Sequence, residues 1–235
     1  MPGRVAIVCA MAQEIEPLVR RWKKVRERGL TFFESEKAVA VVAGIGSAPA
    51  AMAAMTLIAK EQPSCLMSVG LAGALRDDLH VGDVLWPRLV INAATSRRFE
   101  TRNAEANATM VSGKAIAGEQ RKRELRDEFR ADAIDMEGAG VASIADSCGL
   151  PFYAVKAISD EMSFTMPPLN DFVDAKGKLH MFAYGMRALV HPAWWGPTLT
   201  LARNGHTAAV ELCKAVEHQI EQLVTEYSRA LAPRT

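Results

Sequence analysis

The sequence predicts a single α/β domain of the α/β/α type, built around a central, mostly parallel mixed sheet. Two observations support this fold class. Apolar runs rich in β-branched residues recur along the chain, as in strands buried on both faces, and they alternate with stretches of helical spacing. Glycine-rich turns follow several of these runs. A length of 235 residues suits one domain with a full core, so residues 1–235 are assigned to one unit.

The expected elements follow one another from the N-terminus. Strands are expected at 4–11, 38–46, 63–75, 82–92, 131–135 and 151–159, with glycine turns ending the second and third. Helices are expected at 13–24, at 138–147, and at 47–62 with Ser47 as the N-cap. Residues 161–205 form a variable segment rich in Pro and Trp, and residues 207–231 have the apolar spacing of an amphipathic helix.

Composition excludes several classes of function. The formal net charge is +1, so no overall field indicates nucleic acid or an acidic partner. The histidines lack metal-ligand spacing, and no phosphate-binding glycine loop or G-x-S-x-G elbow is present. We therefore expect no metal and no cofactor.

The cysteines and the hydropathy pattern indicate a compartment. Cys9, Cys65, Cys148 and Cys213 lie in apolar runs, which predicts buried free thiols in a reducing environment. The sequence shows no signal-peptide pattern and no apolar run long enough for a transmembrane segment. A cytoplasmic protein is expected.

Ligands of parallel α/β sheets bind outside the carboxyl ends of the strands. Five short stretches follow the predicted strands and should meet in one crevice: 11–14, 44–46, 70–73, 135–137 and 159–160. Three of these stretches carry carboxylates that are candidates for catalysis or binding.

Asp160 ends a predicted buried strand. Carboxyl groups at partly desolvated strand ends hold their proton more strongly and can donate it at neutral pH. The alternative, which spacing alone favours, is that Asp160 caps the next turn together with Ser159. Glu14 follows the first strand, and its spacing favours an exposed acid on a helix surface.

Met136 and Glu137 directly precede the helix expected at 138–147. In one interpretation Glu137 offsets the helix dipole and Met136 fills a gap in the core. In the other they form a sugar site, where the carboxylate accepts hydrogen bonds from vicinal hydroxyls and stabilises a ribosyl cation. Both interpretations stay open from spacing alone, and Asp135 is assigned to capping the helix.

Six stretches of the sequence, in order, resemble the nucleoside phosphorylase and nucleosidase family. This family includes purine nucleoside phosphorylases, uridine phosphorylases and methylthioadenosine/S-adenosylhomocysteine nucleosidases. The stretches extend from Val5 to Asp160: VAIVCAMAQEIEPL, VVAGIGSAPAAMAA, SVGLAGALRDDLHVGDVL, VSGKAIAG, AIDMEGAGVASIA and PFYAVKAISD. The resemblance implies an enzyme that cleaves the N-glycosidic bond of a purine nucleoside, with adenine and a modified 5′-position expected.

The resemblance also implies roles by matched position. Asp160 is expected to protonate the departing purine, and Glu14 to activate water. Glu137 is expected to bind the ribose hydroxyls, with Met136 packing on the sugar. The implied base and nucleophile pocket comprises Ile45, Gly70, Leu71, Ala72, Gly73, Ile116 and Ser159, where Ile116 replaces an aromatic residue that flanks adenine in the nucleosidases.

The chain departs from the phosphorylase pattern in two places. Ser68 stands where purine phosphorylases of the family hold phosphate with arginine, and Leu71 stands where both branches commonly have serine. Leu71 cannot donate to phosphate and Glu14 would repel it, so water is the favoured nucleophile. Inorganic phosphate stays open as a co-substrate, because five arginines are candidates to reach the site: Arg20, Arg21, Arg97, Arg98 and Arg102.

The tail after Asp160 resembles that of the hopanoid-associated phosphorylases, which act on an adenosyl group attached to a triterpenoid lipid. Its apolar residues are candidates to line an exit for such a group: Phe164, Met166, Met181, Phe182, Trp194 and Trp195. An oligomer interface or core packing explains them equally well. The resemblance implies a homodimer or larger homo-oligomer, and two competing hypotheses are a non-catalytic nucleoside-binding module and peripheral docking of HPAWWGPTL on a membrane.

Overall fold

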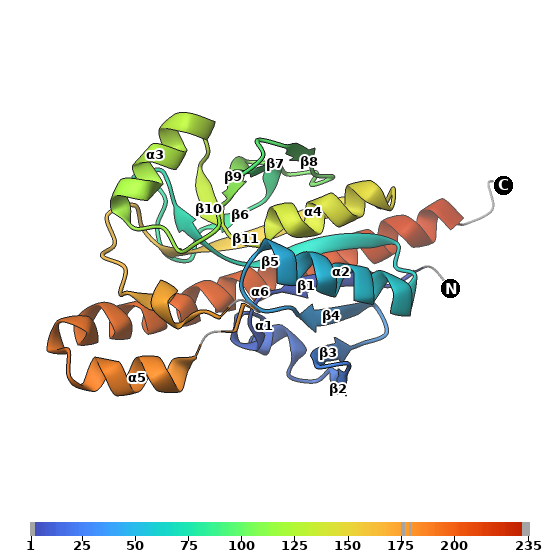
Figure 1. Cartoon of the computed structure of the whole chain (residues 1–235). Helices are drawn as coiled ribbons and strands as arrows, with labels where there is room; N and C mark the ends of the chain where they lie inside the picture. The colour runs from blue at the N-terminus through green and yellow to red at the C-terminus, as the bar shows by residue number, and fades with distance from the viewer. Residues whose placement is uncertain (1–2, 175–176, 179, 232–235) are drawn as a thin grey trace.

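The computed structural model describes residues 3–174, 177–178 and 180–231 and shows a mixed β-sheet with helices on both faces (Figure 1). Strands β4, β1, β5 and β11 pair in parallel, and so do β10, β9 and β7. The outer pairs β2–β3, β3–β4, β7–β8 and β6–β11 are antiparallel, as is the β5–β10 junction that joins the two parallel groups. The strands are β1 (Val5–Cys9), β2 (Lys23–Glu27), β3 (Leu30–Glu34), β4 (Ala38–Val42), β5 (Cys65–Ala74), β6 (Val84–Leu85), β7 (Pro87–Asn92), β8 (Arg98–Glu100), β9 (Ala108–Ser112), β10 (Ala133–Asp135) and β11 (Phe152–Asp160).

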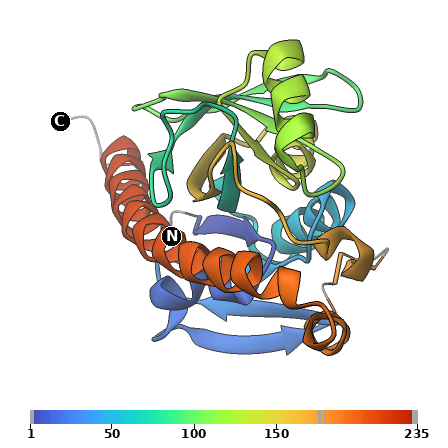
Figure 2. The same ribbon diagram turned by 90° about the vertical axis from the view of Figure 1, so that its left-hand side faces the viewer.

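The helices form two outer layers. Helices α2 (Ser47–Glu61) and α4 (Gly138–Ser147) cover one face of the sheet, and α1 (Ala12–Val19) and α6 (Trp195–Leu231) cover the other (Figure 2). Helix α3 (Glu119–Phe129) packs over β7 and β9. The short elements η1 (Leu169–Phe172), α5 (Met181–Leu189) and η2 (Pro192–Trp194) lie between β11 and α6. The expected α/β/α arrangement with a central mixed sheet is therefore confirmed.

Apolar spacing explains the helix packing. In α6 the buried residues Ala208, Leu212, Val216 and Ile220 recur every fourth position and meet the central strands. Helix α2 instead buries small residues, which lets it lie close to α4. The buried face of α6 packs on the sheet, and this packing fixes the strand ends that carry the site.

Several boundaries differ from the sequence-based expectation. Ser47 is the first residue of α2 and Gly46 is its N-cap. The expected glycine turn at 70–73 is part of strand β5, which continues to Ala74 because β11 pairs with it along its length. The C-terminal helix begins at Trp195, twelve residues before the expected start at 207.

Some elements were not expected at all. The expected helix at 13–24 ends at Val19, and Lys23 begins the β2–β3 hairpin, whose largely exposed strands give little hydrophobic signal. Helix α3 buries only three residues among many charges, so its periodicity was weak. Cys148 is exposed, against the expectation of a buried thiol, whereas Cys9, Cys65 and Cys213 are buried.

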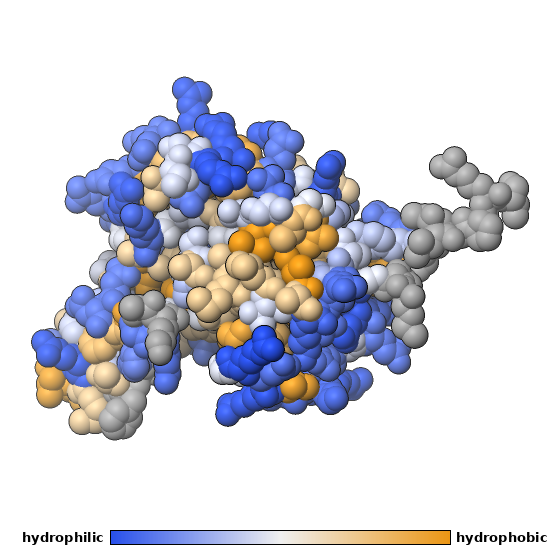
Figure 3. Space-filling view, turned by 45° about the vertical axis from the view of Figure 1, so that its right-hand side comes forward, coloured by the Kyte–Doolittle hydropathy of each residue, from blue (hydrophilic) through white to orange (hydrophobic). Residues whose placement is uncertain are grey.

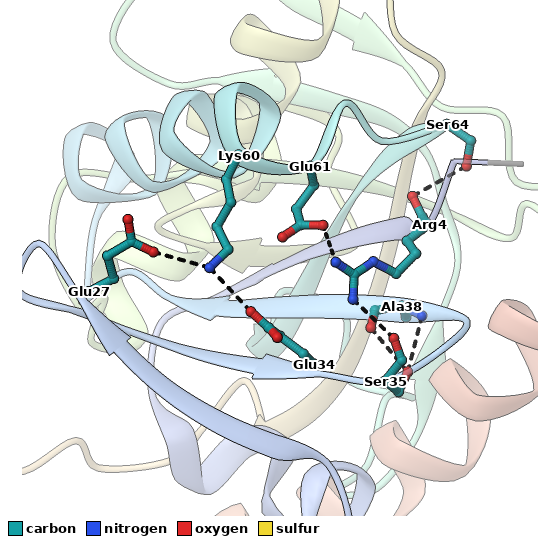
Figure 4. Close-up of polar contacts among 8 residues, drawn as sticks. All are labelled: Arg4, Glu27, Glu34, Ser35, Ala38, Lys60, Glu61 and Ser64. Carbon is teal, nitrogen blue, oxygen red and sulfur yellow. Dashed lines mark hydrogen bonds and ion pairs between the residues drawn. The ribbon is translucent and has the colours of Figure 1, made fainter. Parts of the chain in front are cut away.

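A polar cluster ties α2 to the strands at the end of the sheet remote from the site (Figure 4). Lys60 Nζ lies 3.1 Å from Glu27 and 3.2 Å from Glu34, and Arg4 pairs with Glu61 and donates to the Ser35 carbonyl at 3.1 Å. The Lys60 contacts tie α2 to the β2–β3 hairpin, and the Arg4 contacts lie just before the first residues of β1 and β4. Among the residues that the structure describes, no helix combines the length and the apolar character needed to cross a membrane.

Candidate active site

A cavity of about 490 Å³ opens at the carboxyl ends of the strands. All five stretches that were expected to meet there contribute to its wall. Of the expected site residues, those that line it are Glu14, Ile45, Leu71, Ala72, Gly73, Ile116, Met136, Glu137, Ser159 and Asp160. Gly70 lies directly behind them, since a side-chain carbon placed on it would stand 3.5 Å from both carboxylate oxygens of Glu14.

Glu14 is buried, so the expectation of an exposed helix acid is wrong. Only 4% of the residue is exposed, and Oε2 accepts hydrogen bonds from the backbone N–H groups of Ala10 at 3.0 Å and Met11 at 2.9 Å. Burial raises the pKa of Glu14, while these N–H groups and Lys156 oppose the rise. The first turn of α1 thus folds back on the end of β1 and holds a carboxylate inside the cavity.

Lys156 is a buried cation that sequence reasoning missed. It stands in the middle of β11 with 1% exposure, and its Nζ lies 2.7 Å from Asp135 Oδ2. Burial disfavours its charge, but the carboxylates of Asp135, Glu137 and Glu14 outweigh burial and raise the pKa of Lys156. A side-chain carbon on Gly70 would lie 3.6 Å from Nζ, so Lys156 and Glu14 approach the same point of β5.

Asp135 connects this cation to α4. Its Oδ1 accepts from the Ser112 hydroxyl at 2.6 Å, and its Oδ2 accepts from the Gly138 backbone N–H at 2.8 Å. The Ser112 hydroxyl oxygen in turn accepts from the Ala139 N–H at 2.9 Å. Asp135 therefore satisfies the first N–H group of the helix, as expected for a cap, and also compensates Lys156.

Glu137 is the N-cap residue of α4, yet its side chain turns away from that helix. Its Oε1 accepts from the backbone N–H of Gly46, at the start of α2, at 2.7 Å. Burial, with repulsion from Asp135 and Glu14, raises the pKa of Glu137 to about 7, against the opposing effect of Lys156. The carboxylate makes no capping hydrogen bond to α4, and it lines the cavity beside Met136.

Asp160 ends β11 and has a cationic partner that the sequence did not indicate. Lys122 of α3, 1% exposed, places Nζ 2.5 Å from Asp160 Oδ2 and also donates to the Glu161 carbonyl at 2.7 Å. Asp160 Oδ1 accepts from the Ser159 hydroxyl at 2.8 Å. A side-chain carbon on Gly73 would lie 2.8 Å from Asp160 Oδ2, so glycine is needed there for the carboxylate to reach the cavity.

The outer wall of the cavity comes from the variable segment and α6. Its apolar part includes Met166, Pro167, Leu169, Tyr184 and Leu201. Of the residues expected to line an apolar exit, only Met166 does so among those whose side chains are described. Phe164 and Trp194 lie outside the cavity wall, Trp195 is exposed, and the side chains of Met181 and Phe182 lie outside the described residues.

The five candidate phosphate-binding arginines do not line the cavity within this chain. Arg97 pairs with Asp146 at 3.2 Å, and Arg98 and Arg102 line a separate pocket between β8 and α4. Ser68 is buried inside β5 and also stays outside the cavity. Among the described residues, Lys122 lines the cavity, and Lys156 lies behind its wall beside Gly70 and Glu14.

Known proteins share the sequence pattern and the fold of this chain. The sequence profile of the Phosphorylase superfamily matches residues 4–115 and 104–180, which together span most of the chain. The chain belongs to the Phosphorylase superfamily. This assignment confirms the resemblance seen in the sequence and the expectation of an enzyme.

Among its relatives in this superfamily are two curated nucleosidases. The aminodeoxyfutalosine nucleosidase of Campylobacter jejuni is 26% identical over 196 residues, covering 67% of this chain and 86% of the relative. The 5′-methylthioadenosine/S-adenosylhomocysteine nucleosidase of Actinobacillus succinogenes is 28% identical over 196 residues, covering 67% and 85%.

Solved structures of superfamily members share the fold. The nucleosidase of Colwellia psychrerythraea in complex with adenine superposes with a TM-score of 0.72 at 20% identity, covering 95% of this chain and 96% of the other. The nucleosidase of Neisseria meningitidis in complex with methylthio-immucillin-A gives a TM-score of 0.69 at 21% identity, covering 91% and 96%. The profile match ends at residue 180, so α5 and α6 lie beyond it.

Proposed function

We propose that this chain hydrolyses the N-glycosidic bond of an adenine nucleoside that carries a substituent on its 5′-carbon. The observation that carries the proposal is the joint placement of Glu14, Glu137 and Asp160, all at most 8% exposed, on the wall of one cavity at the strand ends. The nucleosidase activities of the relatives support the reaction class.

Ribose binding is assigned to Glu137 and Met136. Glu137 Oε1 is held by the Gly46 N–H, which fixes the carboxylate without consuming all of its acceptor sites. A carboxylate in this position accepts hydrogen bonds from the ribose hydroxyls, and its negative charge stabilises the ribosyl cation that forms as the base departs.

Attack on the sugar is assigned to a water molecule held between Glu14 and Lys156. Both groups approach Gly70, and among the described residues Lys156 Nζ forms no hydrogen bond of good geometry beyond its ion pair with Asp135. Water adds to C1′ and Glu14, whose pKa is raised by burial, accepts its proton. Three carboxylates around one lysine repel a phosphate dianion, which favours water over inorganic phosphate as the co-substrate.

Departure of the base is assigned to Asp160. The C1′–N9 bond breaks and its electron pair moves to the purine, which must gain a proton to leave as a neutral base. Asp160 delivers that proton to the base, and the ammonium of Lys122, 2.5 Å away, pairs with the carboxylate that remains. Ser159 and Lys122 together hold the carboxyl group in a single orientation.

The 5′-substituent is proposed to be apolar. Met166, Pro167, Leu169 and Leu201 line the outer part of the cavity, and this lining suits a hydrocarbon group, as in an adenosyl group attached to a triterpenoid lipid. The four free cysteines are consistent with the reducing cytoplasm that we propose as its location.

We also propose that the chain forms a homodimer through α2. Ala48, Met52, Met55 and Ala59 are exposed on one face of that helix, and Met52 is 70% exposed. An apolar surface is seen over α2 at the centre of Figure 3. Light scattering should give a dimer for the wild type and a monomer for Met52→Glu, and a monomeric wild type would exclude this assembly.

The function is tested by product analysis. Adenine release is measured from methylthioadenosine, adenosine and an adenosyl-lipid analogue, with and without phosphate, and the sugar product is identified as ribose or ribose 1-phosphate. Asp160→Asn should reduce release at least 100-fold, while Asp171→Asn, an exposed carboxylate of η1, should not. Release by Asp160→Asn at the wild-type rate would remove Asp160 from the mechanism, and calorimetric binding without any release would identify a nucleoside-binding module instead.

A further inference from the structure

The hairpin formed by α5, η2 and the first turns of α6 protrudes from the body of the molecule (Figure 1, lower left). It carries five of the seven most exposed large apolar side chains among the described residues, with exposures of 55% to 73%: Met186, Leu189, Val190, Trp195 and Leu199. Figure 3 shows apolar surface at this protruding end. The concentration is unusual because a soluble surface ordinarily carries such residues singly.

These side chains form two stripes. Met186, Leu189 and Val190 stand at positions i, i+3 and i+4 of α5 and its C-cap, so they share one face. Trp195, Leu199 and Arg203 stand at i, i+4 and i+8 of α6 and share another. The two stripes meet at Trp195, whose indole N–H donates to the Ala188 carbonyl at 2.7 Å.

Most of these side chains contribute little to the packing of the hairpin, although Trp195 joins α6 to Ala188 through its indole N–H. The inner side of the hairpin is held by Tyr184, 2% exposed, which stacks on Trp194 with ring centroids 6.0 Å apart and bonds through its hydroxyl to Thr198. The ring of Phe172, in η1, packs edge-to-face on the Tyr184 ring, with the two centroids 5.3 Å apart. The two exposed stripes are therefore available to contact another surface.

Trp195 is suited to an interface between water and hydrocarbon. Its only polar atom is already satisfied by Ala188, so entering an apolar medium leaves no unpaired donor, while 55% of the residue remains exposed. Tryptophan, leucine and methionine with neighbouring cations are the composition of helices that lie in a bilayer surface.

The charge around the stripes points to the chemistry of the partner. Residues 177–210 contain no Asp or Glu but contain Lys178, Arg187 and Arg203, so this segment has a formal charge of +3. The whole chain has +1, which leaves −2 for the remainder. Arg187 and Arg203 are both exposed beside the apolar stripes.

We propose that this face, defined by Met186, Leu189, Val190, Trp195, Leu199, Arg187 and Arg203, docks peripherally on an anionic phospholipid bilayer. Anionic headgroups pair with the two arginines while the apolar side chains enter the acyl boundary. A second copy of the same face would bring cations against cations with no carboxylate to pair them, which disfavours self-association through it.

Docking would bring one wall of the cavity close to the membrane. The same hairpin carries Tyr184, Thr198, Leu201 and Ala202 on that wall. An apolar molecule dissolved in the bilayer would then have a short path to the cavity. The docking itself stands on the exposed stripes and their charge, independently of the reaction that the cavity performs.

The experiment is vesicle flotation of the full chain. Vesicles of phosphatidylcholine alone are compared with vesicles that also contain phosphatidylglycerol, at low and high salt. The wild type should float with the anionic vesicles and bind them less at high salt, since headgroup attraction is screened. The bound fraction of the Leu189→Glu/Leu199→Glu variant should be at least ten-fold lower than that of the wild type.

A matched control adds the same two charges elsewhere on α6. Gln222→Glu/Thr225→Glu changes two exposed residues at the other end of that helix and should float like the wild type. Circular dichroism checks that both variants are folded. As a second readout, brominated lipid should quench the fluorescence of the wild type but not that of Trp195→Phe to the same extent.

Three results would overturn the docking. The wild type could remain in the soluble fraction with both kinds of vesicle. The Leu189→Glu/Leu199→Glu variant could bind as well as its control. Finally, light scattering could show that this variant alone has half the mass of the wild type, in which case a second copy covers the face.

Discussion

Replacing Glu137 by Gln should stabilise the folded protein above neutral pH while weakening its hold on a riboside. The charge of Glu137 is costly because burial and the carboxylates of Asp135 and Glu14 raise its pKa from the ordinary 4.5 to about 7. A rise of this size corresponds to about 3 kcal/mol of lost folding stability once the group is ionised in both states. Gln keeps an oxygen that can accept the Gly46 N–H bond of 2.7 Å, and the change removes the charge and the longer bond of 3.3 Å that Oε2 accepts from the Met136 N–H.

The sign of the effect depends on pH. The pKa of Glu137 is higher in the folded state than in the unfolded state. The contribution of its proton to the free energy of unfolding is therefore complete below about pH 4.5 and is lost as the pH rises to about 7. Glu137→Gln has no such loss. Its advantage over the wild type should therefore be below about 1 kcal/mol at pH 5 and should reach about 3 kcal/mol at pH 8.

Urea unfolding followed by circular dichroism at pH 5, 6, 7 and 8 measures this difference. At pH 8 the melting temperature should rise by roughly 6–12 °C for a chain of this length. Glu105→Gln, on an exposed loop, serves as the control and should change neither value. If Glu137→Gln is less stable than the wild type at pH 8, or differs from it equally at pH 5 and pH 8, the buried charge does not impose the cost described.

Three further changes probe other parts of the structure. Lys156→Met should lower the free energy of unfolding by about 3–5 kcal/mol in the same urea titration, because it leaves Asp135 with an unpaired buried charge; unchanged stability would show that the pair is not needed. Gly140→Ala should lower the melting temperature, since the added carbon would lie 2.2 Å from the Ser47 carbonyl oxygen, whereas Gly185→Ala in α5 meets nothing within 4 Å and should raise it slightly. An aromatic disulfide reagent should react rapidly with one thiol, the exposed Cys148, and with the other three only after unfolding, because burial shields them and raises the pKa of Cys65 to about 12; fast labelling that persists in Cys148→Ser would contradict this.

The strand ends and their carboxylates could be predicted because two signals coincide there. Each apolar run marks a buried strand, and the acids that follow the runs stand in an order that resembles a known family. Spacing alone placed Glu14 on a surface, whereas the resemblance placed it in the site, because local spacing cannot show that Oε2 turns back to the N–H groups of Ala10 and Met11.

The two buried lysines could not be predicted for a related reason. In the sequence Lys156 interrupts an apolar run and Lys122 stands in the most highly charged helix, so both read as solvent-facing. Their partners are distant along the chain, and Lys122 and Asp160 are separated by 38 positions. These ion pairs form only in the tertiary structure, so no local sequence pattern indicates them.

Different parts of the chain form the two sides of the cavity. Every carboxylate assigned to chemistry lies at or before Asp160, whereas much of the opposing wall, from Met166 to His206, comes later. The two parts are thus consecutive in the sequence. Under the proposed function, substitutions in the later part would alter which 5′-group is accepted and leave the bond-breaking groups in place.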